Sequence, residues 1–112
     1  MTDPQLPEDG AIVLAYFRTP AKALHLAWSL DGLRWSALNG NRPVLPATVS
    51  NRSIRDPIIR RDAEGFFRLV STDSWASQNL ITTRSRDLVE WEPQRLAPVM
   101  EGVGDAQNAW PE

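Results

Sequence analysis

The chain has 112 residues, a length that suits one small domain. Hydrophobic residues make up 42% and charged residues 23%, which is typical of an ordinary globular protein. The formal net charge is −2, arginines are interspersed with carboxylates, and there is no cysteine, so the sequence argues against a nucleic-acid surface and excludes disulfides and thiolate metal sites.

The first ten residues form an acidic, proline-rich stretch. This stretch has no basic region followed by an apolar core, so it does not have the pattern of a signal peptide. No apolar run in the chain approaches the roughly 20 residues that span a bilayer. We therefore expect a cytoplasmic chain that does not associate with a membrane, with an N-terminal tail over residues 1–10.

The rest of the sequence repeats itself at a spacing of 55 or 56 residues. Three pairs of stretches match, namely residues 11–17 with 66–72, Ser29 to Trp35 with Ser85 to Trp91, and Pro43 to Leu45 with Pro98 to Met100. Three anchors at nearly one spacing are not expected by chance, and the whole chain is twice 56 residues long.

Each repeat predicts a series of short strands, because β-branched and aromatic residues fill the runs and Gly, Pro, Asn and Asp separate them. In chain order the expected strands are residues 11–17, residues 23–29, a strand opening at Trp35, residues 53–59, residues 65–71, residues 80–85 and a strand opening at Trp91. A tight turn at Asp31 and Gly32 follows the second of them. Helical periodicity is weak throughout, so the fold class is all-β.

This layout predicts two four-stranded antiparallel blades of a β-propeller. Blade repeat one covers residues 11–52, blade repeat two covers residues 53–107, and residues 108–112 begin a strand of a further blade. Two blades cannot close a ring, and open strand edges are seldom tolerated, so the propeller is incomplete or closes by homo-oligomerisation. A β-sandwich or meander with coincidental turn spacing is the alternative.

Several motifs resemble glycoside hydrolase family 43. They are residues 15–17, residues 24–39, Ile54-Arg55-Asp56-Pro57-Ile58-Ile59, Ser85-Arg86-Asp87-Leu88-Val89-Glu90-Trp91, and the terminal Trp110-Pro111-Glu112. The resemblance covers nearly the whole chain, but only about the first two fifths of a typical family domain. It implies a five-bladed propeller and an arabinofuranosidase, xylosidase or arabinanase activity. The related invertase and levansucrase families also carry Arg-Asp-Pro, so the superfamily is better defined than the family.

The resemblance implies that Asp56 is the general base of an inverting hydrolysis, in which a second carboxyl group protonates the leaving oxygen. The two groups flank the glycosidic bond at roughly 6.5–9.5 Å, which leaves room for a water. In an invertase-like enzyme the same aspartate would instead hold sugar hydroxyls and stabilise the transition state. Arg55 would bind a carboxylate or a sugar hydroxyl. From the residues alone, an aspartate before proline also fits the start of a turn.

Glu112 is the second catalytic candidate by the same resemblance, because family members often carry Trp-Ala-Pro followed by Glu or Asp. Here Ala109 precedes Trp110, so the pattern is one residue short. Trp110 and Trp75 are the candidate residues for binding the sugar, since an aromatic ring suits its apolar face. For Trp75, packing within the fold is the alternative. Many family members hold a calcium ion, but this sequence offers no ligand cluster for one.

Other conspicuous residues have structural interpretations. Trp35 and Trp91 occupy equivalent positions and are expected to fill the core, Asp31 and Asp87 to cap their turns, and the single histidine, His25, to be a structural strand residue. The functional hypotheses are therefore two. The chain is a glycosidase unit acting on an oligosaccharide or glycoside, or a non-catalytic carbohydrate-binding or assembly module that closes by oligomerisation.

Overall fold

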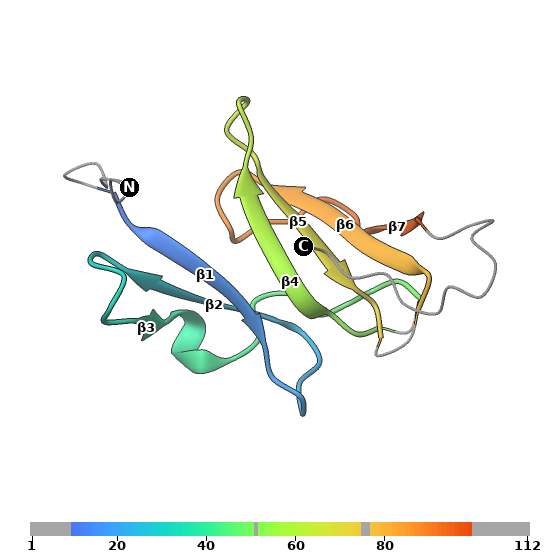
Figure 1. Cartoon of the computed structure of the whole chain (residues 1–112), viewed down its shortest axis with the longest axis horizontal. Coiled ribbons are helices and arrows are strands. Elements are labelled where there is room, and N and C mark those ends of the chain that lie inside the picture. The colour runs from blue at the N-terminus through green and yellow to red at the C-terminus, as the bar shows by residue number, and fades with distance from the viewer. Residues whose placement is uncertain (1–9, 51, 75–76, 100–112) are drawn as a thin grey trace, which may run out of the picture.

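The computed structural model describes residues 10–50, 52–74 and 77–99. In these residues the chain folds into two antiparallel sheets (Figure 1). Sheet A has the order β1-β2-β3, and its strands are β1 (Ile12–Phe17), β2 (Leu24–Ser29) and β3 (Ser36–Ala37). Sheet B has the order β4-β5-β6-β7, with β4 (Arg55–Arg61), β5 (Phe67–Thr72), β6 (Asn79–Ser85) and β7 (Arg95–Pro98). A 3-10 turn, η1 (Leu38–Asn41), follows β3. The all-β prediction is confirmed.

The two sheets correspond to the two sequence repeats. β1 and β2 occupy the positions that β5 and β6 occupy one repeat later, and both pairs are antiparallel hairpins. Sheet B adds β4 at its edge, but sheet A has three strands among the described residues instead of the predicted four. The position that would match β4 lies one repeat earlier, at the N-terminus, and so outside the described residues.

The last strand of each repeat also differs from the prediction. In sheet A only Ser36 and Ala37 pair with β2 before η1 interrupts the strand, and Leu45 then forms a bridge to Leu24. In sheet B the strand begins at Arg95 rather than at Trp91. The last strand of each repeat lies at the edge of its sheet. Its interruption does not disturb the hairpins β1–β2 and β5–β6, which pair along nearly their whole length.

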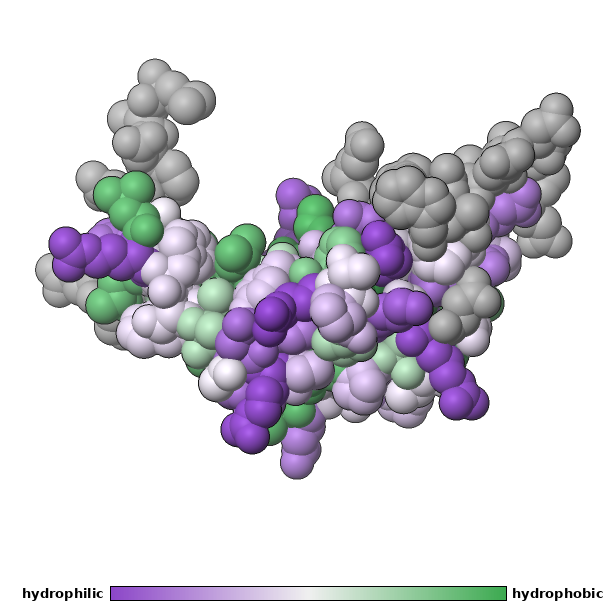
Figure 2. All heavy atoms as spheres, turned by 90° about the horizontal axis from the view of Figure 1, so that it is seen from below, coloured by the Kyte–Doolittle hydropathy of each residue, from purple (hydrophilic) through white to green (hydrophobic). Residues whose placement is uncertain are grey.

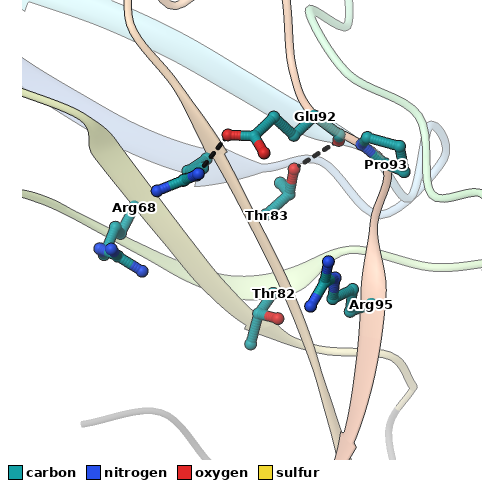
Figure 3. Close-up of a pocket in the computed structure, with 7 residues that line it drawn as sticks. Arg68, Thr82, Thr83, Glu92, Pro93 and Arg95 are labelled. Carbon is teal, nitrogen blue, oxygen red and sulfur yellow. Dashed lines mark hydrogen bonds and ion pairs between the residues drawn. The ribbon is translucent and has the colours of Figure 1, made fainter.

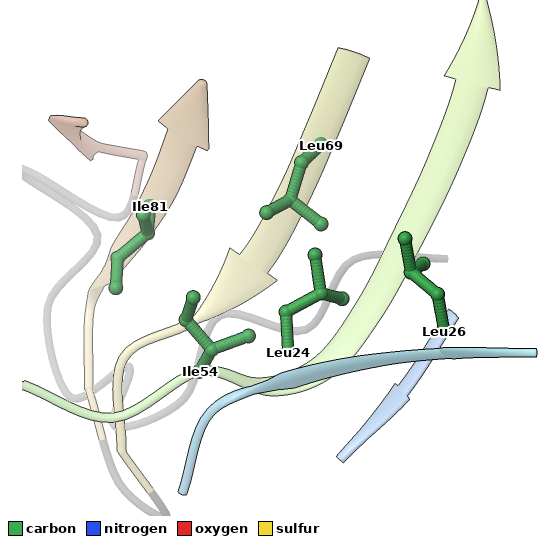
Figure 4. Packing of buried hydrophobic residues seen from close by; sticks show 5 residues of the cluster. All are labelled: Leu24, Leu26, Ile54, Leu69 and Ile81. Carbon is green, nitrogen blue, oxygen red and sulfur yellow. The ribbon is translucent and has the colours of Figure 1, made fainter. Parts of the chain in front are cut away.

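One hydrophobic core joins the two sheets (Figure 4). Its fully buried members come from β2, β5, β6 and the segment before β4, and they are Leu24, Leu26, Ile54, Leu69 and Ile81. β1 lies beside β4, so the two sheets meet along their first strands (Figure 1). Neither sheet therefore folds around a core of its own. These residues show two sheets packed together and do not by themselves show a closed propeller.

Two equivalent turns follow β2 and β6. In the first, the Ser29 hydroxyl accepts from the Gly32 amide at 2.8 Å, and Asp31 Oδ1 accepts from the amides of Leu33 at 2.8 Å and Arg34 at 2.9 Å. The second turn repeats these bonds through the hydroxyl of Ser85 and the carboxylate of Asp87. The prediction that both aspartates cap their turns is confirmed.

The two equivalent tryptophans have different surroundings. Trp91 is half-buried and packs against the core, as predicted. Trp35 is 40% exposed and its indole Nε1 donates to the Gly32 carbonyl, so the prediction that it fills the core is wrong. Trp35 instead lines a surface hollow together with Leu14 and Tyr16. In the view of Figure 2, exposed hydrophobic side chains stand at the end of the molecule that sheet A occupies.

Candidate functional site

The Arg55-Asp56-Pro57 motif lies at the start of β4, where the strand is bulged. Arg55 is the register partner of Thr72 and Ile58 is the partner of Val70, so two residues of β4 stand opposite a single residue of β5. Pro57 cannot donate to the ladder, which places the irregularity here. Bulges of this kind redirect a side chain and are frequent next to active sites.

Asp56 has a left-handed backbone, with φ at 47°. This is the opposite of the usual tendency, because a residue before proline is pushed toward extended conformations. A non-glycine residue in this region costs roughly 1–2 kcal/mol, so the surrounding structure must hold it there. The Asp56 side chain is half-buried, and among the described residues its carboxylate has no hydrogen bond and no ion pair. The acceptor positions of this carboxylate are therefore not occupied by protein groups of the described residues.

Arg55 connects the two sheets at this point. Its guanidinium lies 4.9 Å from the centre of the Phe17 ring, at the end of β1. Its carbonyl accepts a hydrogen bond of 3.3 Å from the Thr72 hydroxyl, which fixes the first residue of β4 against the last residue of β5. The structure thus gives Arg55 a packing role between the two sheets. Its role in substrate binding stays a prediction.

Asp73 is a second carboxylate at the same end of sheet B, and the sequence did not single it out as a site residue. It follows β5 directly and is completely buried. Its Oδ2 accepts a hydrogen bond from the Ser50 hydroxyl, while Oδ1 has no partner among the described residues. Its position after Thr72 places it beside the strand start that carries Asp56. The only signal in the sequence was a turn residue next to a strand end.

The other predicted site residues, Glu112, Trp75 and Trp110, lie outside the described residues. Their predicted roles stay predictions. Among residues 10–50, 52–74 and 77–99, no three His, Cys, Asp or Glu side chains come together as ligands for a metal ion, so the described part of the chain does not fit a calcium site. His25 is buried, with Nδ1 at 3.1 Å from the Ala23 carbonyl and its ring beside Tyr16, as expected of a structural residue.

A charged hollow of about 370 Å³ lies elsewhere, on the face of sheet B that points away from the core (Figure 3). It is lined by Arg68, Thr82, Thr83, Arg84, Glu92, Pro93 and Arg95. The Thr83 hydroxyl donates to the Glu92 carbonyl at 2.6 Å, as Figure 3 shows, and the Glu92 carboxylate pairs with the Arg84 guanidinium. None of the residues around Asp56 lines this hollow, so it is separate from the candidate site.

Three carboxyl groups have a lowered pKa, and each of them stabilises a turn. The pKa of Asp62 is lowered by its hydrogen bond from Arg68, at 2.7 Å, and then by the amides of Phe66 and Glu64. The pKa of Asp31 is lowered mainly by the amides of Arg34 and Leu33. That of Asp87 is lowered mainly by the amides of Glu90 and Val89. All three are turn residues, so these shifts report on the fold and do not mark a catalytic pair.

No helix in the described residues is long and apolar enough to cross a membrane.

No curated protein and no solved structure matches the chain. The sequence profile of a family related to glycoside hydrolase family 43, described as "Probable glycosyl hydrolase domain", matches residues 10–112. This match spans nearly the whole chain and includes the bulged Arg-Asp-Pro segment. The chain therefore belongs to this glycosyl hydrolase domain family.

Proposed function

We propose that the chain forms part of the active site of an inverting glycoside hydrolase acting on arabinofuranosides or xylosides, with Asp56 as the general base. The observation that carries the proposal is the bulge at the start of β4, which holds a half-buried carboxylate in a left-handed conformation without a hydrogen-bonding partner among the described residues. The family match supports the reaction class.

The proposed chemistry follows from what a free carboxylate does next to a glycosidic bond. An oxygen of Asp56 accepts a proton from a water, and the water oxygen then attacks the anomeric carbon. A second carboxyl group gives its proton to the leaving oxygen, so that the bond breaks and the configuration inverts. Glu112 is our candidate for this acid. Arg55 and the sheet behind it hold the Asp56 backbone.

The same proposal covers the architecture. We infer that sheets A and B are neighbouring propeller blades, with β4 as the innermost strand of the second blade. The side-by-side packing of β1 and β4, the shared core and the repeat spacing support this arrangement. In a propeller the innermost strands line a central funnel, which is where Asp56 would meet a sugar.

A panel of nitrophenyl glycosides tests the function. The chain should release nitrophenol from the arabinofuranoside or the xyloside, and Asp56→Asn should abolish the release. Glu64→Gln is the matched control, because Glu64 is an exposed acidic residue in the hairpin after β4, at the far end of sheet B. Loss of activity in both variants, or in neither, would count against a specific role of Asp56.

The second candidate function is a carbohydrate-binding or assembly unit that closes by homo-oligomerisation. It is favoured by a hollow of about 380 Å³ on the outer face of sheet A, where Leu14 and Trp35 lie beside the polar side chains of Arg18 and Asn41. Three chains would supply six blades. A trimer in light scattering, with oligosaccharide binding but no turnover by the wild-type chain, would favour this function, whereas a monodisperse monomer would exclude closure by assembly.

A further inference from the structure

The segment that leads into β4 contains an unusual concentration of left-handed residues. Ser50, Arg52 and Asp56 have φ of 54°, 56° and 47°. None of them is glycine, so each conformation costs energy that other contacts must offset. The segment ends at the residue that we propose as the general base, and anything that fixes its path also fixes that residue.

Two contacts hold this segment against the rest of the fold. In its middle, Ile54 is fully buried in the core, and its amide donates to the Lys22 carbonyl at 2.9 Å. At its start, the Ser50 hydroxyl donates to Asp73 Oδ2. The first contact ties the segment to sheet A and the second ties it to the end of β5. Asp56 comes two residues after the first anchor and six residues after the second.

Asp73 is a costly residue to use as an anchor. A carboxylate that is completely buried loses its hydration, and its Oδ1 gains no hydrogen bond from the described residues in return. A neutral side chain would hold a hydroxyl at lower cost. A fully buried carboxyl group with a single described hydrogen-bond partner indicates that the position serves something other than stability.

We propose that Asp73 is a positioning residue, which acts through Ser50 to hold the segment from Ser50 to Asp56 in the path that presents the Asp56 carboxylate. The inference rests on the proposed function of Asp56, but the contact itself is independent of it. Thr72 supports the same geometry from the neighbouring position, since its hydroxyl donates to the Arg55 carbonyl.

The test is a matched pair of substitutions at Ser50. Ser50→Gly and Ser50→Asn both tolerate a left-handed backbone, but only asparagine supplies a donor for Asp73. Arg52→Gly is the control, because it relaxes a left-handed residue in the same segment and leaves the Ser50 hydroxyl in place. For each variant we would measure the amide hydrogen-exchange rates of Arg55 and Asp56, and kcat/KM on the glycoside that the wild type cleaves.

Ser50→Gly should raise both exchange rates by about tenfold, the equivalent of one lost hydrogen bond. It should lower kcat/KM by on the order of tenfold to a hundredfold, because a displaced catalytic group loses its alignment. Ser50→Asn and Arg52→Gly should stay close to the wild type on both measurements. Equal behaviour of the glycine and asparagine variants at Ser50 would overturn the proposal. If the wild type cleaves no glycoside, the proposed function fails, and the exchange rates alone decide whether Asp73 positions the segment.

Discussion

The turn after β2 and the turn after β6 make the same hydrogen bonds with different residues at their left-handed position. That position is Gly32 in the first turn, with φ at 77°, and Leu88 in the second, with φ at 65°. Glycine adopts this conformation freely, whereas leucine pays for it. Leu88 also packs against the core, which offsets the strain. The serine and aspartate therefore specify the turn, and the residue between them adapts to its surroundings.

The two sheets also differ in their first strand. Among the described residues only sheet B has a strand on the inner side of its hairpin, and that strand carries the bulge and Asp56. Within residues 10–50, 52–74 and 77–99, the repeat thus supplies the hairpin scaffold twice and the candidate site once. The two sheets share one core and one type of turn, and substitutions in each sheet test both features.

The largest effect is expected in the shared core. Leu24→Ala in sheet A and Leu69→Ala in sheet B should each lower the free energy of unfolding by about 2–5 kcal/mol, because both side chains are fully buried in one cluster. Urea unfolding should show a single transition in both variants. Two separate transitions, or a loss confined to one sheet, would mean that the sheets fold independently.

A smaller effect is expected at the first turn. Gly32→Ala should cost about 1 kcal/mol, because alanine is strained at positive φ. An added Cβ would meet the Ile12 side chain at 3.4 Å, an ordinary contact, so backbone strain is the main term. Leu33→Ala is the control, since that side chain is 85% exposed in the same turn. An unchanged melting temperature for the glycine variant would contradict the left-handed requirement.

At the second turn we expect two opposing contributions. Leu88→Gly removes about 1 kcal/mol of backbone strain but also removes a side chain that packs on the core, so the net change should be a loss of less than about 1 kcal/mol. Thermal unfolding measures it. If the glycine variant is more stable than the wild type, the Leu88 side chain contributes nothing to the core and the comparison of the two turns fails.

The smallest effect concerns pH. The pKa values of Asp31 and Asp87 are lowered from 3.8 by the amides that they accept from in the folded state. Such groups stabilise the fold above their unfolded pKa, and the contribution fades as pH falls through the folded value. In the double variant with Asn at both positions, stability should fall less steeply with acid below about pH 4. A steeper fall than in the wild type would contradict this sign.

Much of the fold could be predicted from local pattern. The strands at 12–17, 24–29 and 79–85 and the two serine-aspartate turns follow from alternation and from residues that bond to their own backbone. The exposure of Trp35 could not be predicted, because Trp35 and Trp91 occupy equivalent positions in the repeat and only Trp91 packs against the core. The strand near Trp91 begins four residues later than expected for a similar reason, since its pairing depends on β6.

The candidate site was predicted only in part. Arg-Asp-Pro marked Asp56, but a residue before proline is expected to be extended, so its left-handed backbone was not foreseeable. Asp73 could not be predicted as a site residue, because its burial arises from the packing of the segment around Ser50 and leaves no periodic signal. Long-range contacts decide both features.

The most direct test of the proposed function is the rate of glycoside hydrolysis by the wild type and by Asp56→Asn, measured on the best substrate of the panel at equal folded concentration. A general base contributes at least about a hundredfold, so we expect kcat/KM to fall by that factor or more while the melting temperature stays within a few degrees. An Asp56→Asn variant that retains the wild-type rate would contradict the proposal that the bulge of β4 presents the catalytic carboxylate.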